Sequence, residues 1–237
     1  MKQRYPRLHR HLAARLNPDE AFGLHLTVGV VLLVIASALF GLIASHVVAN
    51  ADITRIDNAL AHWFHQFAGS PWTPLVVAFT DWNHPIGILL MALALGAFFY
   101  RRRERYWLLA LTVAVPGGLI LNVLLKYTFQ RVRPSFEAPL VSLTTFSFPS
   151  GHTSGATVLY GMLAAWLVVS LRKPWQRATV MLGALMMVVL VGTSRLYLGA
   201  HYLSDVLAAM AVGSAWLAVC ITAVSTLRRR MEGRSTT

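Results

Sequence analysis

The sequence predicts an all-α membrane protein: a six-helix transmembrane bundle with short interfacial helices between spans one and two. Three observations support this fold class. Of the 237 residues, 56% are hydrophobic and only 13% are charged, whereas soluble domains carry about 25% charged residues. Apolar runs of about 20 residues, the length that crosses a bilayer, recur along the chain. The basic residues gather in alternate connections between these runs.

The first apolar run, residues 23–46, follows a basic N-terminal segment, residues 1–22. The run is long enough to span a bilayer. The tripeptide ANA at 49–51 resembles a signal-peptide cleavage site, so a cleaved signal peptide is an alternative. We favour an uncleaved first span, because the apolar core of a signal peptide is only about 7–15 residues long.

Residues 51–80 mix aromatic and polar side chains and contain no long apolar run. This pattern is typical of short amphipathic helices that lie in the membrane interface. The second span is predicted over 84–100, and because this run is short for a bilayer, a start near Pro74 is an alternative. The polar residues just before it are assigned a structural role at the helix start, with a place at a pocket mouth as the alternative. They are Asp81, Asn83 and His84.

Four further spans complete the predicted bundle. They cover residues 106–127, 152–171, 178–197 and 203–226. The membrane domain therefore covers 23–226, and a basic cytoplasmic tail of residues 227–237 follows. Pro116 predicts a kink in the third span, which neighbouring helices can accommodate. Cys220, the only cysteine, cannot form an intrachain disulfide, and we interpret it as a buried, inert thiol.

The positions of the basic residues predict the orientation of the bundle. Sixteen of the 21 lysines and arginines lie in four segments: 1–22, 101–105, 172–177 and 228–234. The positive-inside rule places these segments, and with them both termini, in the cytoplasm. The net charge of +12 is therefore mainly a topology signal, and nucleic acid is not expected as a partner.

The other five basic residues lie on the outer side of this topology, where cations are disfavoured. They are Arg55, Lys126, Arg131, Arg133 and Arg195. A single lysine or arginine near a helix end often only places its charged group at the membrane–water interface and has no further role. Here, however, three of them meet three further ionisable residues at the outer ends of different helices. The six residues of this set are Lys126, Arg133, His152, Arg195, His201 and Asp205.

The residue types in this set suit a phosphate group. Lysine and arginine supply point and forked donors to anionic oxygens. Backbone amides at Ser150 and Gly151 can bind an anion at the start of the fourth span, where the helix dipole favours negative charge. His201 and Asp205 share a helix face, so the carboxylate can hold one imidazole nitrogen and leave the other free as a nucleophile. His152, from another helix, can act as a general acid.

The outer carboxylates do not form a pattern of metal ligands. None makes a close pair or an Asp/Glu/His cluster of the kind that magnesium or zinc needs. They are Asp52, Asp57, Asp81, Glu137 and Asp205. We therefore expect neither a metal nor another cofactor.

Three segments that contain the outer set resemble the signature motifs of the type-2 phosphatidic acid phosphatase superfamily. They are KYTFQRVRP from Lys126, PSGH from Pro149, and SRLYLGAHYLSD from Ser194. PSGH alone is a weak signal, but the three motifs in this order are specific. The resemblance covers about residues 51–226, and it implies a six-helix membrane phosphatase that forms a phosphohistidine without a metal.

The resemblance also implies a role for each motif residue. His201 would be the nucleophile, Asp205 its orienting partner and His152 the proton donor to the leaving group. The phosphate would be held by Lys126, Arg133, Ser150, Gly151 and Arg195. Arg131 matches no motif position, and we assign it to the surface or to lipid headgroups.

The expected substrate is a membrane lipid with a phosphate or diphosphate, because the outer loops are short and no soluble domain is evident. Within the superfamily the bacterial candidates are undecaprenyl diphosphate, phosphatidylglycerol phosphate and phosphatidic acid, and analogy favours the first or broad specificity. The resemblance implies a multi-pass enzyme of the bacterial inner membrane with its site on the outer face. A lipid phosphotransferase and a non-enzymatic lipid-binding or transport protein are the alternatives. The sequence does not predict the oligomeric state.

Overall fold

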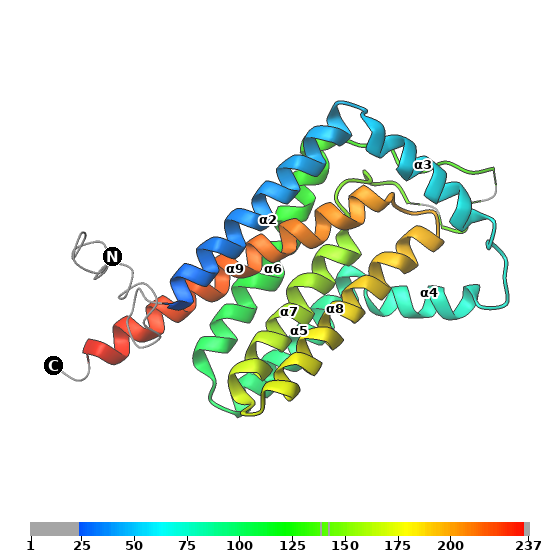
Figure 1. The fold of residues 1–237 in the computed structure, drawn as a ribbon. Coiled ribbons are helices and arrows are strands. Elements are labelled where there is room, and N and C mark those ends of the chain that lie inside the picture. The colour runs from blue at the N-terminus through cyan, green and yellow to red at the C-terminus, as the bar shows by residue number, and fades with distance from the viewer. Residues whose placement is uncertain (1–23, 138, 142, 235–237) are drawn as a thin grey trace, which may run out of the picture.

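The computed structural model describes residues 24–137, 139–141 and 143–234. Within these ranges the chain forms eight helices and no strand, so the all-α prediction is confirmed (Figure 1). The helices are α2 (Leu24–Val48), α3 (Asp52–His65), α4 (Thr73–Trp82), α5 (Pro85–Arg101), α6 (Arg105–Phe129), α7 (Gly151–Ser170), α8 (Pro174–Tyr197) and α9 (Leu203–Arg234). The predictions for residues 1–22 and for the last three residues lie outside the described residues.

Five helices, α2, α6, α7, α8 and α9, are long and apolar enough to cross a membrane. A sixth span exists if α4 and α5, which are bent by 53° across a short break, count as one. The alternative start of the second span near Pro74 matches the beginning of α4 at Thr73. Helix α9 continues through Arg234, beyond the predicted end of the sixth span at residue 226.

Helix α7 lies at the centre of the bundle and packs against α5, α6, α8 and α9. Its outer half is almost fully buried. Small residues make this packing possible, as in other membrane bundles. A Cβ at Gly155 would lie 3.2 Å from Ile88 of α5, and one at Gly213 of α9 would lie 3.0 Å from Thr157. Close approach of α5 and α9 to α7 fixes the end of the bundle where the motif residues meet.

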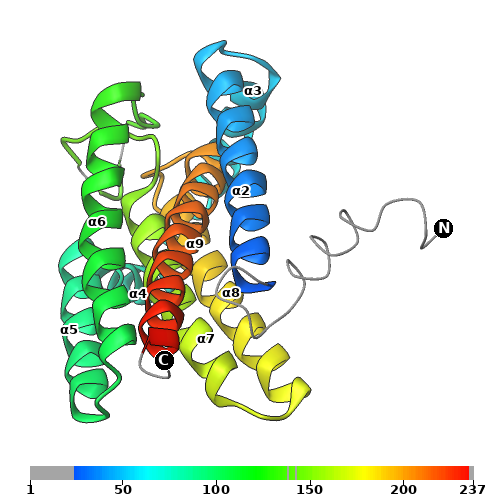
Figure 2. The same cartoon turned by 90° about the vertical axis from the view of Figure 1, so that its left-hand side faces the viewer.

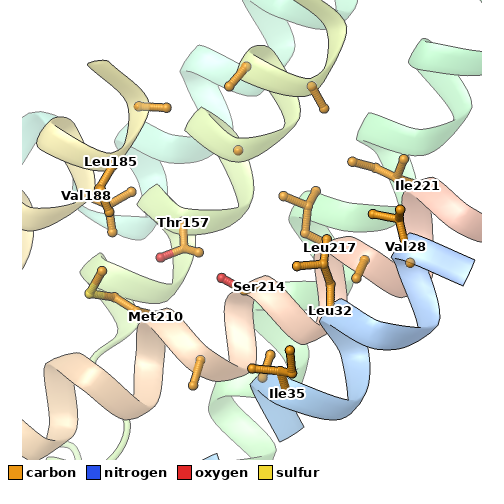
Figure 3. Close-up of a pocket in the computed structure, with 18 of the residues that line it drawn as sticks. Val28, Leu32, Ile35, Thr157, Leu185, Val188, Met210, Ser214, Leu217 and Ile221 are labelled. Carbon is orange, nitrogen blue, oxygen red and sulfur yellow. The ribbon is translucent and has the colours of Figure 1, made fainter. Parts of the chain in front are cut away.

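Helix α2 is the least buried of the spans. It packs along α9, on the side of the bundle away from α5 (Figures 1 and 2), and only 6% of its most apolar window is buried. A groove of about 1040 Å³ lies between α2, α7, α8 and α9. Figure 3 shows aliphatic side chains of these helices turned toward it, with Thr157 and Ser214 among few polar ones. Such a lining suits hydrocarbon chains and not a phosphate group.

Helix α3 packs against α8 and α9 at the outer end of the bundle (Figure 1). Its sequence is amphipathic, and Asp57 and Ala61, one turn apart, are its buried residues. Most of its other side chains are exposed or half-buried. The predicted short helices between the first two spans are therefore α3 and, if it does not form one span with α5, α4. Helix α3 brings a buried carboxylate to the ends of α8 and α9.

Candidate active site

The carboxyl ends of α6 and α8 and the amino ends of α7 and α9 meet at one end of the bundle and bring the three motifs together. Lys126, near the end of α6, donates to the carbonyl oxygen of Phe146, and so does Arg133. Arg133 Nη1 also lies 3.2 Å from His201 Nε2. These contacts connect the first motif to the third through the loop that leads into α7.

Two local features shape this end of the bundle. The hydroxyl of Ser150 caps α7 by accepting from the amide of Thr153, 3.5 Å away, a frequent use of serine at a helix start. Between α8 and α9 the chain turns at Gly199, whose φ of +64° favours glycine. A Cβ there would lie 2.8 Å from the ring of Phe136. The turn places His201 directly before α9.

Arg133 fixes the loop before α7 against the turn between α8 and α9. Its guanidinium donates to the carbonyl and hydroxyl of Thr145 at 2.6 and 3.0 Å, and to the carbonyl of Ala200 at 2.6 Å. Burial lowers its pKa, against the charge of Asp205, which acts to raise it. The planar guanidinium thus organises two segments that are 55 or more residues apart in sequence.

The contacts of His201 define its tautomer. Arginine can only donate, so the 3.2 Å contact with Arg133 makes Nε2 the acceptor. The proton then lies on Nδ1, which faces Asp205 Oδ2 at 3.4 Å. Burial, the largest influence, lowers the pKa of His201 to about 3, although the hydrogen bond and charge of Asp205 act to raise it. His201 is therefore a neutral imidazole whose Nε2 lone pair faces the guanidinium of Arg133.

Asp205 is fully buried and accepts from several donors besides His201. The hydroxyl of Ser147 and the amide of Tyr202, at 2.8 Å, bind Oδ2, the oxygen that also faces His201. Oδ1 binds Arg131 at 2.6 Å. The contact with His201 is the longest of the four, so the carboxylate is held mainly by its other partners.

The assignment of Arg131 to the surface or to lipid headgroups is wrong. Its side chain is only 12% exposed and forms ion pairs with Asp205 and, at 2.8 Å, with Asp57 of α3. Burial alone would lower the pKa of Arg131, but the charges and hydrogen bonds of the two carboxylates outweigh it and raise the pKa. Arg131 and Arg133 are two apart before Pro134, and extended backbone at this point would direct both to one side. That spacing is the signal that the sequence interpretation missed.

Three other residues of the site were not predicted as part of it: Asp57, Ser147 and Ser204. Both carboxylate oxygens of Asp57 bind Ser204, one to its amide at 2.9 Å and the other to its hydroxyl. Asp57 and Asp205 are far apart in the sequence, but in the structure one arginine, Arg131, joins them. Asp57 gives a weak sequence signal, because its partners lie 74 and 147 residues away.

His152 and Arg195 form the opposite side of the site. Among the described residues, no hydrogen bond reaches the His152 ring, whose nearest aromatic neighbour is His84 at 5.4 Å. The positive charges of Arg195 and Arg133 lie within electrostatic reach of it. Arg195 is 2% exposed and donates from Nη1 to Thr80 at 2.9 Å. Its Nε is buried without a partner in the described part of the chain, which is costly unless a ligand accepts from it.

The predicted phosphate contacts at the start of α7 differ between Ser150 and Gly151. The Ser150 amide donates to the backbone carbonyl of Asp205 at 3.1 Å, and its hydroxyl caps the helix. Gly151 is the first residue of α7, and amides in a first turn lack intrahelical acceptors. A Cβ at Gly151 would lie 3.2 Å from Asn122 and 3.9 Å from Lys126. The geometry therefore prepares Gly151 better than Ser150 for an anion.

Asp81, Asn83 and His84, the polar residues before α5, were predicted to have a structural role or to lie at a pocket mouth, and the structure shows both cases. Asn83 is buried and bonds Phe79 and the hydroxyl of Tyr160 at 3.0 and 2.9 Å, which is the structural role. His84 is exposed, caps α5 and faces His152. Asp81 is exposed beside it. His84 therefore fits the alternative place at the mouth of the site.

Comparison with known proteins identifies the family. Residues 105–229, more than half of the chain, match the model of the PAP2 superfamily. The chain belongs to the PAP2 superfamily. This PAP2 protein is 40% identical over 128 residues to phosphatidylglycerophosphatase B of Bacillus subtilis, a match that covers 53% of this chain and 61% of the relative. It is 37% identical over 135 residues to decaprenylphosphoryl-5-phosphoribose phosphatase of Mycobacterium tuberculosis, which covers 56% and 68% of the two chains.

The fold of the PAP2 protein also matches a solved structure. The crystal structure of a transmembrane PAP2-type phosphatidylglycerolphosphate phosphatase from Bacillus subtilis aligns with a TM-score of 0.72 at 30% identity. The alignment covers 80% of this chain and 94% of that structure. The all-helical membrane fold, with five or six spans, and the family named from the motifs are thereby confirmed.

The family match does not include all residues that support the site. It begins at residue 105, so Asp57 of α3 and Thr80 of α4 lie before it. Asp57 bonds Arg131, and Thr80 bonds Arg195. The N-terminal part of the PAP2 protein therefore adds one partner to each of two cations of the matched region.

Proposed function

We propose that this PAP2 protein is an integral-membrane lipid phosphatase that hydrolyses a phosphate or diphosphate monoester through a phosphohistidine intermediate. The observation that carries the proposal is the geometry of His201. Its Nδ1 proton faces Asp205, and its Nε2 lone pair faces the guanidinium of Arg133. This is the arrangement that nucleophilic catalysis by imidazole requires.

In the first proposed step, His201 Nε2 forms a bond to phosphorus while the bond from phosphorus to the lipid oxygen breaks. His152 donates its proton to that oxygen, so the leaving group departs protonated. Lys126, Arg133 and Arg195, with the amides at the start of α7, bind the phosphoryl oxygens and stabilise the transition-state charge. The structure supports these roles by placing all these groups at one end of the bundle.

In the second step, water attacks the phosphorus atom of the phosphohistidine. His152, now unprotonated, accepts a proton from this water, and inorganic phosphate leaves with neutral His201 restored. An alcohol in place of water would give a phosphotransferase, the first alternative. A protein that only binds or transports lipid, the second alternative, would not need the tautomer that Asp205 imposes on His201.

We propose a lipid phosphate as substrate. The names of the relatives describe two phosphatases, one for a phosphatidylglycerol lipid and one for a decaprenyl lipid. Both names favour a lipid monophosphate over undecaprenyl diphosphate, the substrate that family analogy favoured. The lipids in the two names belong to different classes, so the names do not favour one lipid tail. The aliphatic groove of Figure 3 supports a hydrocarbon environment near the same helices.

We also propose that the site faces outward from a bacterial inner membrane and that no metal is needed. Basic clusters at 101–105 and 172–177 support this orientation, because these connections lie at the helix ends opposite to the site. Among the described residues, no group of three or more His, Cys, Asp or Glu side chains could hold a metal ion. Arg133 and Lys126, the cations within electrostatic reach of His201, can supply charge stabilisation instead.

The decisive experiment measures inorganic phosphate released from purified lipid phosphates in detergent. The panel contains phosphatidylglycerol phosphate, phosphatidic acid and undecaprenyl diphosphate. We expect release from at least one lipid, inhibition by vanadate, no inhibition by EDTA, and loss of turnover in His201→Ala. Removing the nucleophile leaves no group to form the phosphohistidine.

Three results would contradict the proposal. One is a folded His201→Ala protein that turns over normally, and another is a strict requirement for added magnesium. The third is a transfer product with an alcohol acceptor that exceeds free phosphate, which would favour the phosphotransferase. Protein folding is checked for each variant by its thermal unfolding midpoint.

A further inference from the structure

Arg131 joins two buried carboxylates from distant parts of the chain. Its Nη1 binds Asp205 of α9 at 2.6 Å and its Nη2 binds Asp57 of α3 at 2.8 Å. Both carboxylates are fully buried. The guanidinium also lies over the ring of Tyr202, 4.3 Å from its centroid. Neither α3 nor Asp57 belongs to the region that matches the family model.

Asp57 also holds the start of α9. Its carboxylate accepts from the amide and the hydroxyl of Ser204, the residue directly before Asp205. A carboxylate at a helix N-terminus satisfies an amide that has no intrahelical acceptor and interacts favourably with the helix dipole. Asp57 is therefore connected to Asp205 in two ways, through Arg131 and through the backbone of Ser204.

The two oxygens of Asp205 face different partners. Oδ1 faces Arg131, and Oδ2 faces His201. A bond from Arg131 to Oδ1 thus limits rotation of the carboxylate and leaves Oδ2 in position for the Nδ1 proton. Without Arg131, Asp205 would be a buried anion with no ion-pair partner among the contacts described, a state that favours protonation or rotation.

We infer that Asp57 and Arg131 are positioning residues for the nucleophile: Asp57 fixes Arg131, and Arg131 fixes the Asp205 carboxylate that holds the tautomer of His201. This inference rests on the proposed function in naming His201 as the nucleophile. It assigns α3 a role in the chemistry at the outer end of the bundle. Neither residue contacts the phosphate, so both act through Asp205.

The same helix supplies a matched control. Asp52 and Arg55 of α3 form an ion pair at 3.3 Å, but their side chains are 89% and 81% exposed. Exposed ion pairs contribute little, because water and salt screen them. Asp52→Asn removes a carboxylate of the same type from the same helix and should leave the site unchanged.

The experiment compares Asp57→Asn, Arg131→Met, the double variant and Asp52→Asn in detergent, with phosphatidylglycerol phosphate as substrate. We expect each single variant at the buried pair to lower kcat by about 10–100-fold, the range for partners that orient a functional ligand, and to change KM by less than about threefold. Because both act through one contact, the double variant should be no slower than Arg131→Met. Asp52→Asn should match the wild type.

Rescue by charge provides a second comparison. Arg131→Lys keeps a cation that can bind one carboxylate but not both, so its kcat should lie between those of Arg131→Met and the wild type. This variant also keeps the test valid if Arg131→Met fails to fold. A kcat within threefold of wild type in folded Asp57→Asn and folded Arg131→Met would overturn the inference. A double variant whose loss equals the product of the single losses would overturn it too.

A readout without turnover separates this inference from the proposed function. The imidazole ¹⁵N shifts of histidine-labelled protein report which nitrogen carries the proton, and His201→Gln identifies the His201 signals by their absence. We expect the Nδ1 proton in the wild type and in Asp52→Asn, and loss of that preference in Arg131→Met. If the wild type hydrolyses no lipid of the panel, the proposed function fails while this test still applies. An unchanged tautomer in folded Arg131→Met would contradict the positioning role.

Discussion

The two sides of the candidate site differ in how completely their polar groups are paired. On the side of His201, both ring nitrogens have partners, and Asp205 accepts from four groups. On the side of His152, the ring has no hydrogen bond among the described residues, and Arg195 Nε has no partner there either. Both sides are buried to a similar degree. Burial therefore does not explain the difference.

This difference indicates separate tasks for the two sides. A nucleophile works best when its orientation is fixed before the substrate arrives, and a saturated set of partners fixes it. Arg195 Nε and the His152 ring can bind a phosphate or transfer a proton without displacing a partner among the described residues, whereas Lys126 and Arg133 already donate to carbonyl oxygens. Substitutions on the His201 side should therefore disturb orientation, and those on the His152 side should remove an interaction with the substrate.

The largest effect on the less paired side is expected for His152→Ala. Without the proton donor, the lipid oxygen must leave as an alkoxide, so kcat should fall by about 10²–10⁴-fold. KM should change little, because the cations proposed to bind the phosphate remain. The measurement is steady-state phosphate release from the best lipid of the panel at a fixed detergent concentration.

The role of His152 as proton donor can be tested with a better leaving group. p-Nitrophenyl phosphate releases a phenolate that is stable without a proton, so the loss in His152→Ala should shrink for this substrate. An equal loss for both substrates would mean that His152 does not donate the proton. His84→Ala is the matched control, because its ring lies 5.4 Å from that of His152 at the mouth of the site and is given no part in proton transfer.

A smaller loss is expected for Arg195→Met. The substitution keeps much of the side-chain volume but removes a buried donor from the phosphate site, which should lower kcat/KM by about 10²–10³-fold. Inhibition by vanadate should weaken in parallel, because vanadate presents the same type of anionic oxygens. Thr80→Val is the control: it removes the partner of Arg195 Nη1 but leaves the cation. Unchanged vanadate inhibition in Arg195→Met would show that Arg195 does not contact the phosphate.

The sequence was sufficient for the helices because their signals are local. Predicted spans at 106–127 and 178–197 correspond to α6 at Arg105–Phe129 and α8 at Pro174–Tyr197, since apolar length and helix-end residues determine both. The bend between α4 and α5 was only partly anticipated, because composition shows where apolar residues lie but not the direction of the backbone.

The long-range pairs of the site could not be predicted in this way. The motif residues were found because their spacing within each segment is recognisable. Arg131 was misplaced because its environment depends on the path of the loop and on the packing of α3. Two buried partners of these pairs, Asp57 and Ser204, are 147 residues apart, and no periodic pattern connects them. Site residues that belong to a local motif could thus be predicted from the sequence. Partners that only the packing of distant segments brings together could not.

The smallest predicted effect concerns stability and pH on the more paired side. The folded-state pKa of His201 is about 3 because of burial, whereas an unfolded histidine has a pKa of about 6.5. Between these values the unfolded chain binds a proton that the folded chain excludes. Stability is therefore complete above pH 6.5 and decreases as the pH falls toward 3, by at most about 1.4 kcal/mol per pH unit from this group.

The thermal unfolding midpoint in detergent, measured from pH 7.5 to 4.5, checks this expectation against His201→Gln, which has no proton to bind. The midpoint of the wild type should fall more steeply with decreasing pH than that of the variant. Equal slopes would mean that His201 is protonated in the folded protein, and the fixed tautomer would then be wrong. Because His201 stays neutral above about pH 4, a loss of activity between pH 7 and 5 in folded protein must come from another group. That loss would come from protonation of the substrate phosphate, or from protonation of His152 before it can act as base in the second step.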